Sequence, residues 1–243
     1  MPATSAAWRR RADVPRSVRG RPVGRRTVCV YAIVANRGAP TSLRVAGQRF
    51  RIVREGAIGA VVNDDARRLA PTPLNLRRYD RVVRELAERF PAMIPARFGT
   101  LMAQDELTFT LSSRRAVLAG VLRRVRSRVQ MTIRVMPIGS PLSAPHEGQP
   151  PIPTTGRDYL IARARAAAAA RAVPGFEPVR EAVSRWVRDE RVEHQAGVSS
   201  VYHLIPRASV TAYRAALRTS AAAANVTTIV SGPWPPYAFA SPD

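Results

Sequence analysis

The sequence predicts an α+β protein in two parts, and three observations support this. Segments with the alternation or β-branched composition of strands are interspersed with segments of helical hydrophobic period in both halves of the 243 residues. Residues 137–155 separate the halves, because six prolines and two glycines fall there with little periodicity. Hydrophobic residues make up 46% of the chain, near the globular norm, so each half can bury a core.

The chain divides into four expected regions. Residues 1–26 carry eight arginines against one acid, Asp13, together with helix-breaking prolines and glycines, and predict a disordered Arg-rich arm. Residues 27–138 should form an N-terminal α+β domain, and residues 156–243 a C-terminal α+β domain. The proline-rich residues 139–155 should link the two.

The first half begins with three predicted strands and a long predicted helix. Residues 27–36 are rich in β-branched side chains and apolar on both faces, as in a central strand. Residues 49–54 and 57–63 flank a Glu-Gly turn, as in a hairpin. Residues 74–90 combine apolar residues at helical spacing with arginines, which predicts an amphipathic helix.

The residues before the predicted linker include segments with the alternation of a strand and a segment with the spacing of a helix. Residues 107–111 alternate leucine and phenylalanine with threonine, which locally favours a strand. Residues 113–128 have apolar residues at helical spacing and predict a second helix. Residues 129–135 alternate between apolar and polar side chains, as a half-buried strand does.

The second half predicts the order helix, helix, strand, helix, strand. The helices are expected over residues 157–171, where alanine dominates, over 177–190 and over 206–223. The strands are expected over residues 198–205 and 226–230.

Charge is the most unusual property of the composition. All 39 basic residues are arginine, and with 17 acidic residues they give a formal net charge of +22, of which the arm contributes +7. Without lysine the chain has no P-loop lysine, no Schiff-base lysine and no S-x-x-K pair. Arginine neutralises phosphates, so a basic nucleic-acid-binding module with a ferredoxin-like fold is the alternative function.

The aromatic residues argue against that alternative. RNA-binding sheets need exposed aromatic side chains in an RNP-type pattern, and no predicted strand carries one. We therefore expect any contact with nucleic acid to be non-specific and to involve the arm.

Residues typical of catalysis or metal binding do not gather in the sequence. The histidines His146, His194 and His203 are scattered over the linker, a helix end and a strand, and the single cysteine, Cys29, cannot form an internal disulfide or a Cys-based zinc site. His203 alternates with apolar residues, which favours a packed strand residue over a general base. We expect no enzyme activity, no cofactor and no metal. Because no stretch approaches the ~18 apolar residues of a spanning helix, we also expect a cytoplasmic protein without membrane contact.

Two segments have a composition that ordinary helices, strands and loops do not share. Residues 95–100 have the sequence PARFGT, and we expect a tight turn in which Gly99 adopts positive φ while Arg97 caps a helix or pairs with an acid. Residues 231–239 have the sequence SGPWPPYAF, which can be neither helix nor central strand. We expect this segment to be extended and stiff, with Trp234 and Tyr237 as packing anchors. The bond before Pro235 follows an aromatic residue and is a candidate cis peptide.

Together these segments resemble the gas vesicle GvpL/GvpF family. The matches, in the family's order, are VYAIV at residues 30–34, IPARFGT at 94–100, GRDYL at 156–160 and SGPWPPYAF at 231–239. They cover about residues 27–240 and leave only the arm outside. The resulting candidates for structural or partner-binding roles are Arg97, Phe98, Gly99, Thr100, Gly156, Tyr159, Leu160, Gly232, Pro233, Trp234, Pro235, Pro236, Tyr237 and Phe239.

Three positions depart from the family pattern. Tyr79 stands where many family members have histidine, Gln130 where glutamate is usual, and Ala238 where serine is usual. The resemblance also implies that residues 107–111 join the following helix, against their local strand pattern.

The resemblance implies both a fold and a function. The implied fold is α+β, with two domains that are each a ferredoxin-like variant of helices packed on a small mixed or antiparallel sheet. The implied function is that of a gas vesicle accessory or minor structural protein, which binds the hydrophobic main shell protein through residues 27–138 and prevents its aggregation during nucleation and assembly. A soluble partner can cover exposed apolar surface until subunits join the wall. The implied partners are this shell protein and other gas vesicle accessory proteins, at the vesicle in the cytoplasm.

Overall fold

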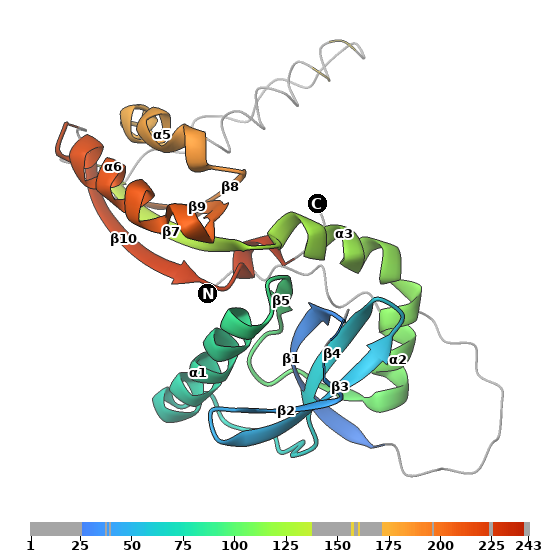
Figure 1. The fold of residues 1–243 in the computed structure, drawn as a ribbon. Helices are drawn as coiled ribbons and strands as arrows, with labels where there is room; N and C mark the ends of the chain where they lie inside the picture. Colours follow the sequence, from blue (N-terminus) through green and yellow to red (C-terminus); the bar gives the residue numbers. More distant parts are fainter. Residues whose placement is uncertain are drawn as a thin grey trace.

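The computed structural model describes residues 26–36, 38, 40–137, 157, 160, 172–195, 197–223 and 226–240. The expected arm, the expected linker and most of the expected helix over 157–171 lie outside these residues. The described residues form two sheets with helices packed on them (Figure 1). We call residues 26–127 the first unit and the described residues from 128 to 240 the second unit.

The first unit is built on a six-stranded antiparallel sheet. Its strands are β1 (Thr27–Ala35), β2 (Ser42–Val45), β3 (Gln48–Glu55), β4 (Ile58–Asn63), β5 (Met93–Pro95) and β6 (Leu101–Ala103). The strand order is β2-β3-β4-β1-β5, and β6 also pairs with β1. The predicted hairpin is therefore β3 and β4, and the predicted central strand is β1.

Helices cover both faces of this sheet (Figure 1). The helix α1 (Pro73–Arg89) packs on one face and buries Tyr79, Val82, Val83 and Leu86. The helices α2 (Gln104–Ser113) and α3 (Arg115–Val125) pack on the other face. Because β1 lies between two helical layers, its side chains are apolar on both sides, as a central strand requires.

The prediction of a strand over residues 107–111 is wrong, because these residues lie in α2. Leu107 and Leu111 are four residues apart and share one helical face, where they are 2% and 0% exposed. Phe109 lies on the other side of the helix and is 68% exposed. The alternation of the sequence thus fits a helix once the phenylalanine faces solvent.

The second unit is a four-stranded antiparallel sheet with helices on one face (Figure 1). Its strands are β7 (Arg128–Pro137), β8 (Asp189–Gln195), β9 (Val198–Pro206) and β10 (Val226–Trp234), in the order β10-β7-β9-β8. The helices α5 (Glu177–Val183) and α6 (Val210–Ala223) pack on β7 and β9 around Phe176, Val179 and Tyr213. None of the helices in the described ranges has the length and apolar character that crossing a bilayer requires.

Two expectations about this unit need correction. The strand β7 was expected within the N-terminal domain over 27–138, but it pairs with β9 and β10 in the second sheet. The helix expected over 177–190 ends at Val183, and β8 occupies its last residues. The sequence of β8, DERVEHQ, is polar because β8 is an edge strand with a half-exposed surface, so hydrophobic periodicity cannot reveal it.

The two units share a core. Leu204 of β9 and Phe239, in the single turn Tyr237–Phe239 after β10, pack in the same cluster as the buried residues of α2, α3 and β1. Hydrogen bonds reinforce the junction: the Arg207 N–H donates to the Ser127 carbonyl at 3.0 Å, and the Arg207 guanidinium donates to the Ala87 carbonyl at 2.9 Å. The units are therefore packed as one body along this junction.

Replacing Phe239 with alanine should destabilise the whole protein. Its side chain is 0% exposed in the core of the first unit, although it belongs to the end of the chain. Loss of a buried phenylalanine costs about 3–5 kcal/mol of unfolding free energy, which urea denaturation followed by circular dichroism would measure. The matched control is Phe109→Ala, which removes the same ring from an exposed helix surface. Equal, small losses in both variants would contradict the packing of Phe239.

Candidate functional site

The RFGT segment forms the expected tight turn between β5 and β6. The Thr100 N–H and the Thr100 hydroxyl both donate to the Arg97 carbonyl, at 3.2 and 2.8 Å. Gly99 has a φ of +73°, a conformation that glycine adopts without strain. The Arg97 side chain is exposed and forms no ion pair with a described residue, so the pairing expected for it is not observed.

A row of aromatic rings fixes this turn to the sheet and to α1. Phe98 packs edge-on against Tyr79 at 5.4 Å between ring centroids, and Tyr79 stacks on Tyr31 at 5.0 Å. The Tyr79 hydroxyl donates to the Ala96 carbonyl at 2.7 Å. Burial raises the pKa of Tyr31 to about 12 and also raises the pKa of Tyr79. Both phenols therefore remain protonated and available as donors at neutral pH.

The SGPWPPYAF segment begins as the end of β10. The register of β10 on β7 shifts between Ser231 and Trp234, so the strand carries an irregularity at Gly232. The cis peptide precedes Pro233 rather than Pro235. Gly232 has a φ of +116°, and a Cβ added there would lie 2.8 Å from the Gln130 carbonyl oxygen. Only glycine fits this close approach of two backbones.

The rest of the segment lies in the junction between the units. The Arg84 guanidinium of α1 lies over the Trp234 ring, 4.2 Å from its centroid. The Ala238 N–H donates to Gln130 Oε1 at 2.7 Å, and Arg124 donates to the Phe239 carbonyl at 3.1 Å. Pro235 and Pro236 are buried, whereas Tyr237 remains 38% exposed. The segment thus contacts α1, α3 and β7 at once.

The GRDYL candidates contribute little to this geometry. Gly156 and Tyr159 lie outside the described residues. Leu160 is described and is 65% exposed. The structure therefore brings together the candidates of 95–100 and 231–239 around α1, but it does not bring Leu160 to them.

His203 lies in a buried polar cluster beneath α5 and α6. Its side chain is 0% exposed, Nε2 lies 2.8 Å from Glu190 Oε2, and Nδ1 lies 2.6 Å from the Tyr213 hydroxyl. Arg180 Nε contacts the same Glu190 oxygen at 3.2 Å. This confirms His203 as a packed strand residue, held between partners that satisfy both ring nitrogens.

The electrostatics of this cluster favour an ionised Glu190. Burial opposes ionisation, but the hydrogen bonds and charges of His203 and Arg180 outweigh it and hold the pKa of Glu190 below its ordinary value of 4.5. Among the described residues, no group of three or more His, Cys, Asp or Glu side chains is arranged to hold a metal ion.

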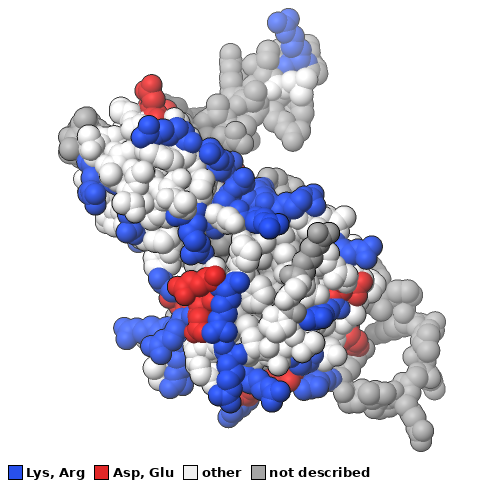
Figure 2. Space-filling view, viewed as in Figure 1, with Lys and Arg blue, Asp and Glu red and all other residues white. Residues whose placement is uncertain are grey.

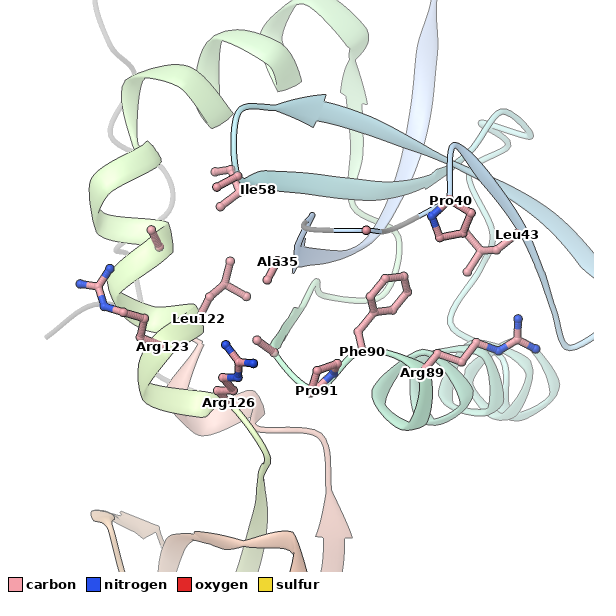
Figure 3. Close-up of a pocket in the computed structure, with 14 residues that line it drawn as sticks. Ala35, Pro40, Leu43, Ile58, Arg89, Phe90, Pro91, Leu122, Arg123 and Arg126 are labelled. Carbon is pink, nitrogen blue, oxygen red and sulfur yellow. The ribbon is translucent and has the colours of Figure 1, made fainter.

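A cavity of about 620 Å³ opens in the first unit, between the end of α1 and α3 (Figure 3). Its lining is mostly apolar and includes Ala35, Leu43, Ile58, Phe90, Pro91 and Leu122. Arg89, Arg123 and Arg126 also line it, and none of the described residues around it is acidic. Sequence reasoning missed this cavity because its walls come from four separate stretches of the chain.

The surface charge is spread rather than gathered. Figure 2 shows arginine side chains over both units on the visible face, with the acidic side chains in a few small groups. Several arginines pair with acids on the surface, as Arg84 does with Asp80 at 2.7 Å and Arg67 with Asp65 at 2.8 Å.

A family model described as "Gas vesicle synthesis protein GvpL/GvpF" matches residues 28–241. The chain belongs to the GvpL/GvpF family. The match includes both units and both unusual segments, and it confirms the family indicated by the sequence motifs. It leaves the whole of the expected arm, residues 1–26, outside.

Solved GvpF structures share the fold of this GvpL/GvpF chain. The crystal structure of the gas vesicle protein GvpF from Anabaena superposes with a TM-score of 0.65 and 12% identity, covering 89% of this chain and 97% of that chain. The crystal structure of GvpF from Microcystis aeruginosa gives a TM-score of 0.66 and 11% identity, covering 89% of this chain and 99% of that chain. Comparison with curated protein sequences finds no match.

Two departures from the GvpL/GvpF pattern lie against the motif segments. Tyr79 donates to Ala96 beside the RFGT turn, and Gln130 accepts from Ala238 in the last motif. The sequence singled out both positions as departures, but their connection to the motifs needed the structure. Tyr79 and Gln130 each place a neutral hydrogen-bonding side chain at their position.

Gly232→Ala should destabilise this GvpL/GvpF protein by roughly 2 kcal/mol or more, because the methyl group meets the Gln130 carbonyl at a φ that side chains avoid. Urea denaturation would measure the change. The control is Gly120→Ala in α3, where the nearest atom to the new Cβ lies 3.9 Å away. This control should be neutral or stabilising by up to about 1 kcal/mol. A tolerated alanine at position 232 would refute the close approach.

Glu190→Gln should make the free energy of unfolding depend less on pH in the acidic range. Because the pKa of Glu190 is lowered in the folded protein, its ionised form stabilises the fold above the unfolded-state pKa, and this contribution is lost as pH falls below about 4.5. The free energy of unfolding, measured by urea titration from about pH 7 to about pH 3, should therefore differ most between wild type and variant at neutral pH. The exposed Glu181→Gln is the matched control. A difference that stays constant with pH would contradict this role.

Proposed function

We propose that this protein is a gas vesicle accessory or minor structural protein that binds the hydrophobic main shell protein and prevents its aggregation during vesicle nucleation and assembly. The observation that carries the proposal is membership of the GvpL/GvpF family over residues 28–241. The first unit is the proposed binding part, and other accessory proteins of the vesicle are further proposed partners.

The physical role follows from the problem that a hydrophobic shell subunit presents. Exposed apolar surface and unpaired strand edges drive aggregation. A partner that covers this surface reversibly keeps the subunit available for the growing wall. The first unit offers an apolar cavity with arginines around it, on a charged surface that keeps the complex in solution.

We further propose that the protein acts without catalysis, cofactor or metal, in the cytoplasm and at the vesicle. The nearest approach to a catalytic arrangement in the described residues is the cluster of His203, Glu190 and Tyr213, where His203 is 0% exposed. Such a ring has no access to a substrate, so a structural role accounts for it.

The second unit supports a ferredoxin-like classification for this part of the fold. Its order β10-β7-β9-β8, with helices between β7 and β8 and between β9 and β10, is the pattern of a β-α-β-β-α-β motif. The first unit departs from that pattern, because its first four strands follow one another without an intervening helix.

The second sheet gives little support to nucleic-acid binding. On its helix-free face the strand register aligns Tyr202 with Thr132 and Arg191. Tyr202 donates its hydroxyl to Glu193 at 2.9 Å, so the carboxylate lies beside the ring on which a base would stack. Tyr202 beside an acid, and Trp234 of the same sheet under the Arg84 guanidinium, do not form the aromatic platform of an RNA-binding sheet.

Co-production with the main shell protein tests the proposal. We expect the tagged chain to raise the soluble fraction of the shell protein and to retain it during affinity purification, because covered apolar surface cannot aggregate. Quantifying soluble and sedimented shell protein by immunoblot measures this. Shell protein that sediments equally with and without the chain, and does not co-purify, would overturn the function.

A chain lacking residues 1–25 is the control for charge. Arg26 stays, because it pairs with Asp64 at 2.7 Å and its carbonyl accepts from Gln104. We expect the shortened chain to retain the shell protein and to lose any mobility shift with RNA. If the shortened chain fails to retain the shell protein, the binding is instead due to the non-specific charge of the arm.

A further inference from the structure

The cavity between α1 and α3 has the layout of a site for an amphipathic ligand. Its apolar floor is formed by side chains that lie in both cores, since Phe90 belongs to the cluster under α1 and Ile58 and Leu122 to the cluster under α3. The floor therefore rests on the packed interior. A volume of about 620 Å³ is enough for one large or two smaller side chains of a partner.

The rim of the cavity carries uncompensated positive charge. Arg123 and Arg126 are exposed at the end of α3 and lie on the same side of the opening (Figure 3). Neither forms an ion pair with a described residue, whereas Arg89 on the other side pairs with Glu85. Two free guanidinium groups beside an apolar cavity favour a ligand in which a carboxylate accompanies an apolar group.

We propose that this cavity is the docking site for the main shell protein, and that it receives an apolar side chain of the shell protein while a carboxylate of the same segment pairs with Arg123 and Arg126. The inference rests on the proposed function and names the surface of this chain that contacts the shell protein. Charge complementarity disfavours a second copy of this chain as the occupant, because the chain carries a net charge of +22 and would bring arginines against the same rim.

The position of the cavity also suits a transient partner. Its walls combine the ends of α1 and α3 with β1, β2 and β4, so docking orders no additional element of the described fold. A preformed apolar cavity binds without the entropy cost of folding, and the arginine rim accelerates encounter. Salt should weaken this encounter, because exposed charges are screened within about 10 Å at 0.1 M ionic strength.

Filling the cavity and reversing its rim test the inference in the full-length chain. Ala119→Trp places an indole in the cavity, and the double variant Arg123→Glu with Arg126→Glu reverses the rim. Each should lower the affinity for the co-produced shell protein about tenfold or more. The first variant prevents the burial of an aliphatic side chain, which corresponds to a change of this size. The second replaces the attraction for a carboxylate by repulsion. The effect of the double variant should shrink in high salt.

Matched controls separate docking from folding and from total charge. Val117→Trp adds the same ring to an exposed position of α3, and Arg77→Glu with Arg81→Glu makes the same charge change on exposed positions of α1. Circular dichroism and urea denaturation establish that each variant is folded. The controls should retain the shell protein at wild-type levels.

The outcomes distinguish the two proposals. If the wild-type chain fails to retain the shell protein, the proposed function itself fails. If the wild type and all folded variants retain it equally, the function stands and the cavity is overturned as its site. A change in self-association in place of lost shell binding would show that the cavity joins copies of this chain, and would also overturn the inference.

Discussion

The structure depends on the burial of Phe239, a side chain from the end of the second unit, in the core of the first. Its ring is fully excluded from solvent among residues of α2, α3 and β1. To reach that core the chain must leave β10 abruptly and follow a fixed path, which the register shift at Gly232 and the buried Pro235 and Pro236 provide. The composition of SGPWPPYAF thus suits a segment that closes the junction between the two sheets.

Polar side chains satisfy the backbone of both motif segments. Gln130 accepts from the Ala238 N–H, Arg124 donates to the Phe239 carbonyl, and Tyr79 donates to the Ala96 carbonyl. A buried backbone group without a partner costs about as much as a lost hydrogen bond. Because glutamine is neutral and burial raises the pKa of Tyr79, the contacts of Gln130 and Tyr79 involve no charged group at neutral pH.

Most of the charge of this molecule lies apart from its distinguishing features. Most ion pairs of the described residues lie on the surface, where they contribute little to stability. The features that distinguish the protein are apolar: a junction closed by proline and aromatic residues, and a cavity whose floor belongs to both cores of the first unit. Arginine matters at the rim of that cavity because two guanidinium groups there face no acid of the described chain.

The sequence by itself determined the elements with strong periodicity, the family and the conformation of Gly99. It identified β1, the hairpin of β3 and β4, α1, β7 and β9, because each has either a clear apolar period or a continuous run of apolar residues over a sufficient length. Tertiary structure decided the rest. Short strands such as β5 and the polar edge strand β8 exist only through their partners, and residues 107–111 became helical because that places Leu107 and Leu111 on one buried face. The partners of β7, the meeting of the two motif segments and the cavity are likewise long-range, since burial of side chains distant in sequence is a property that no local pattern contains.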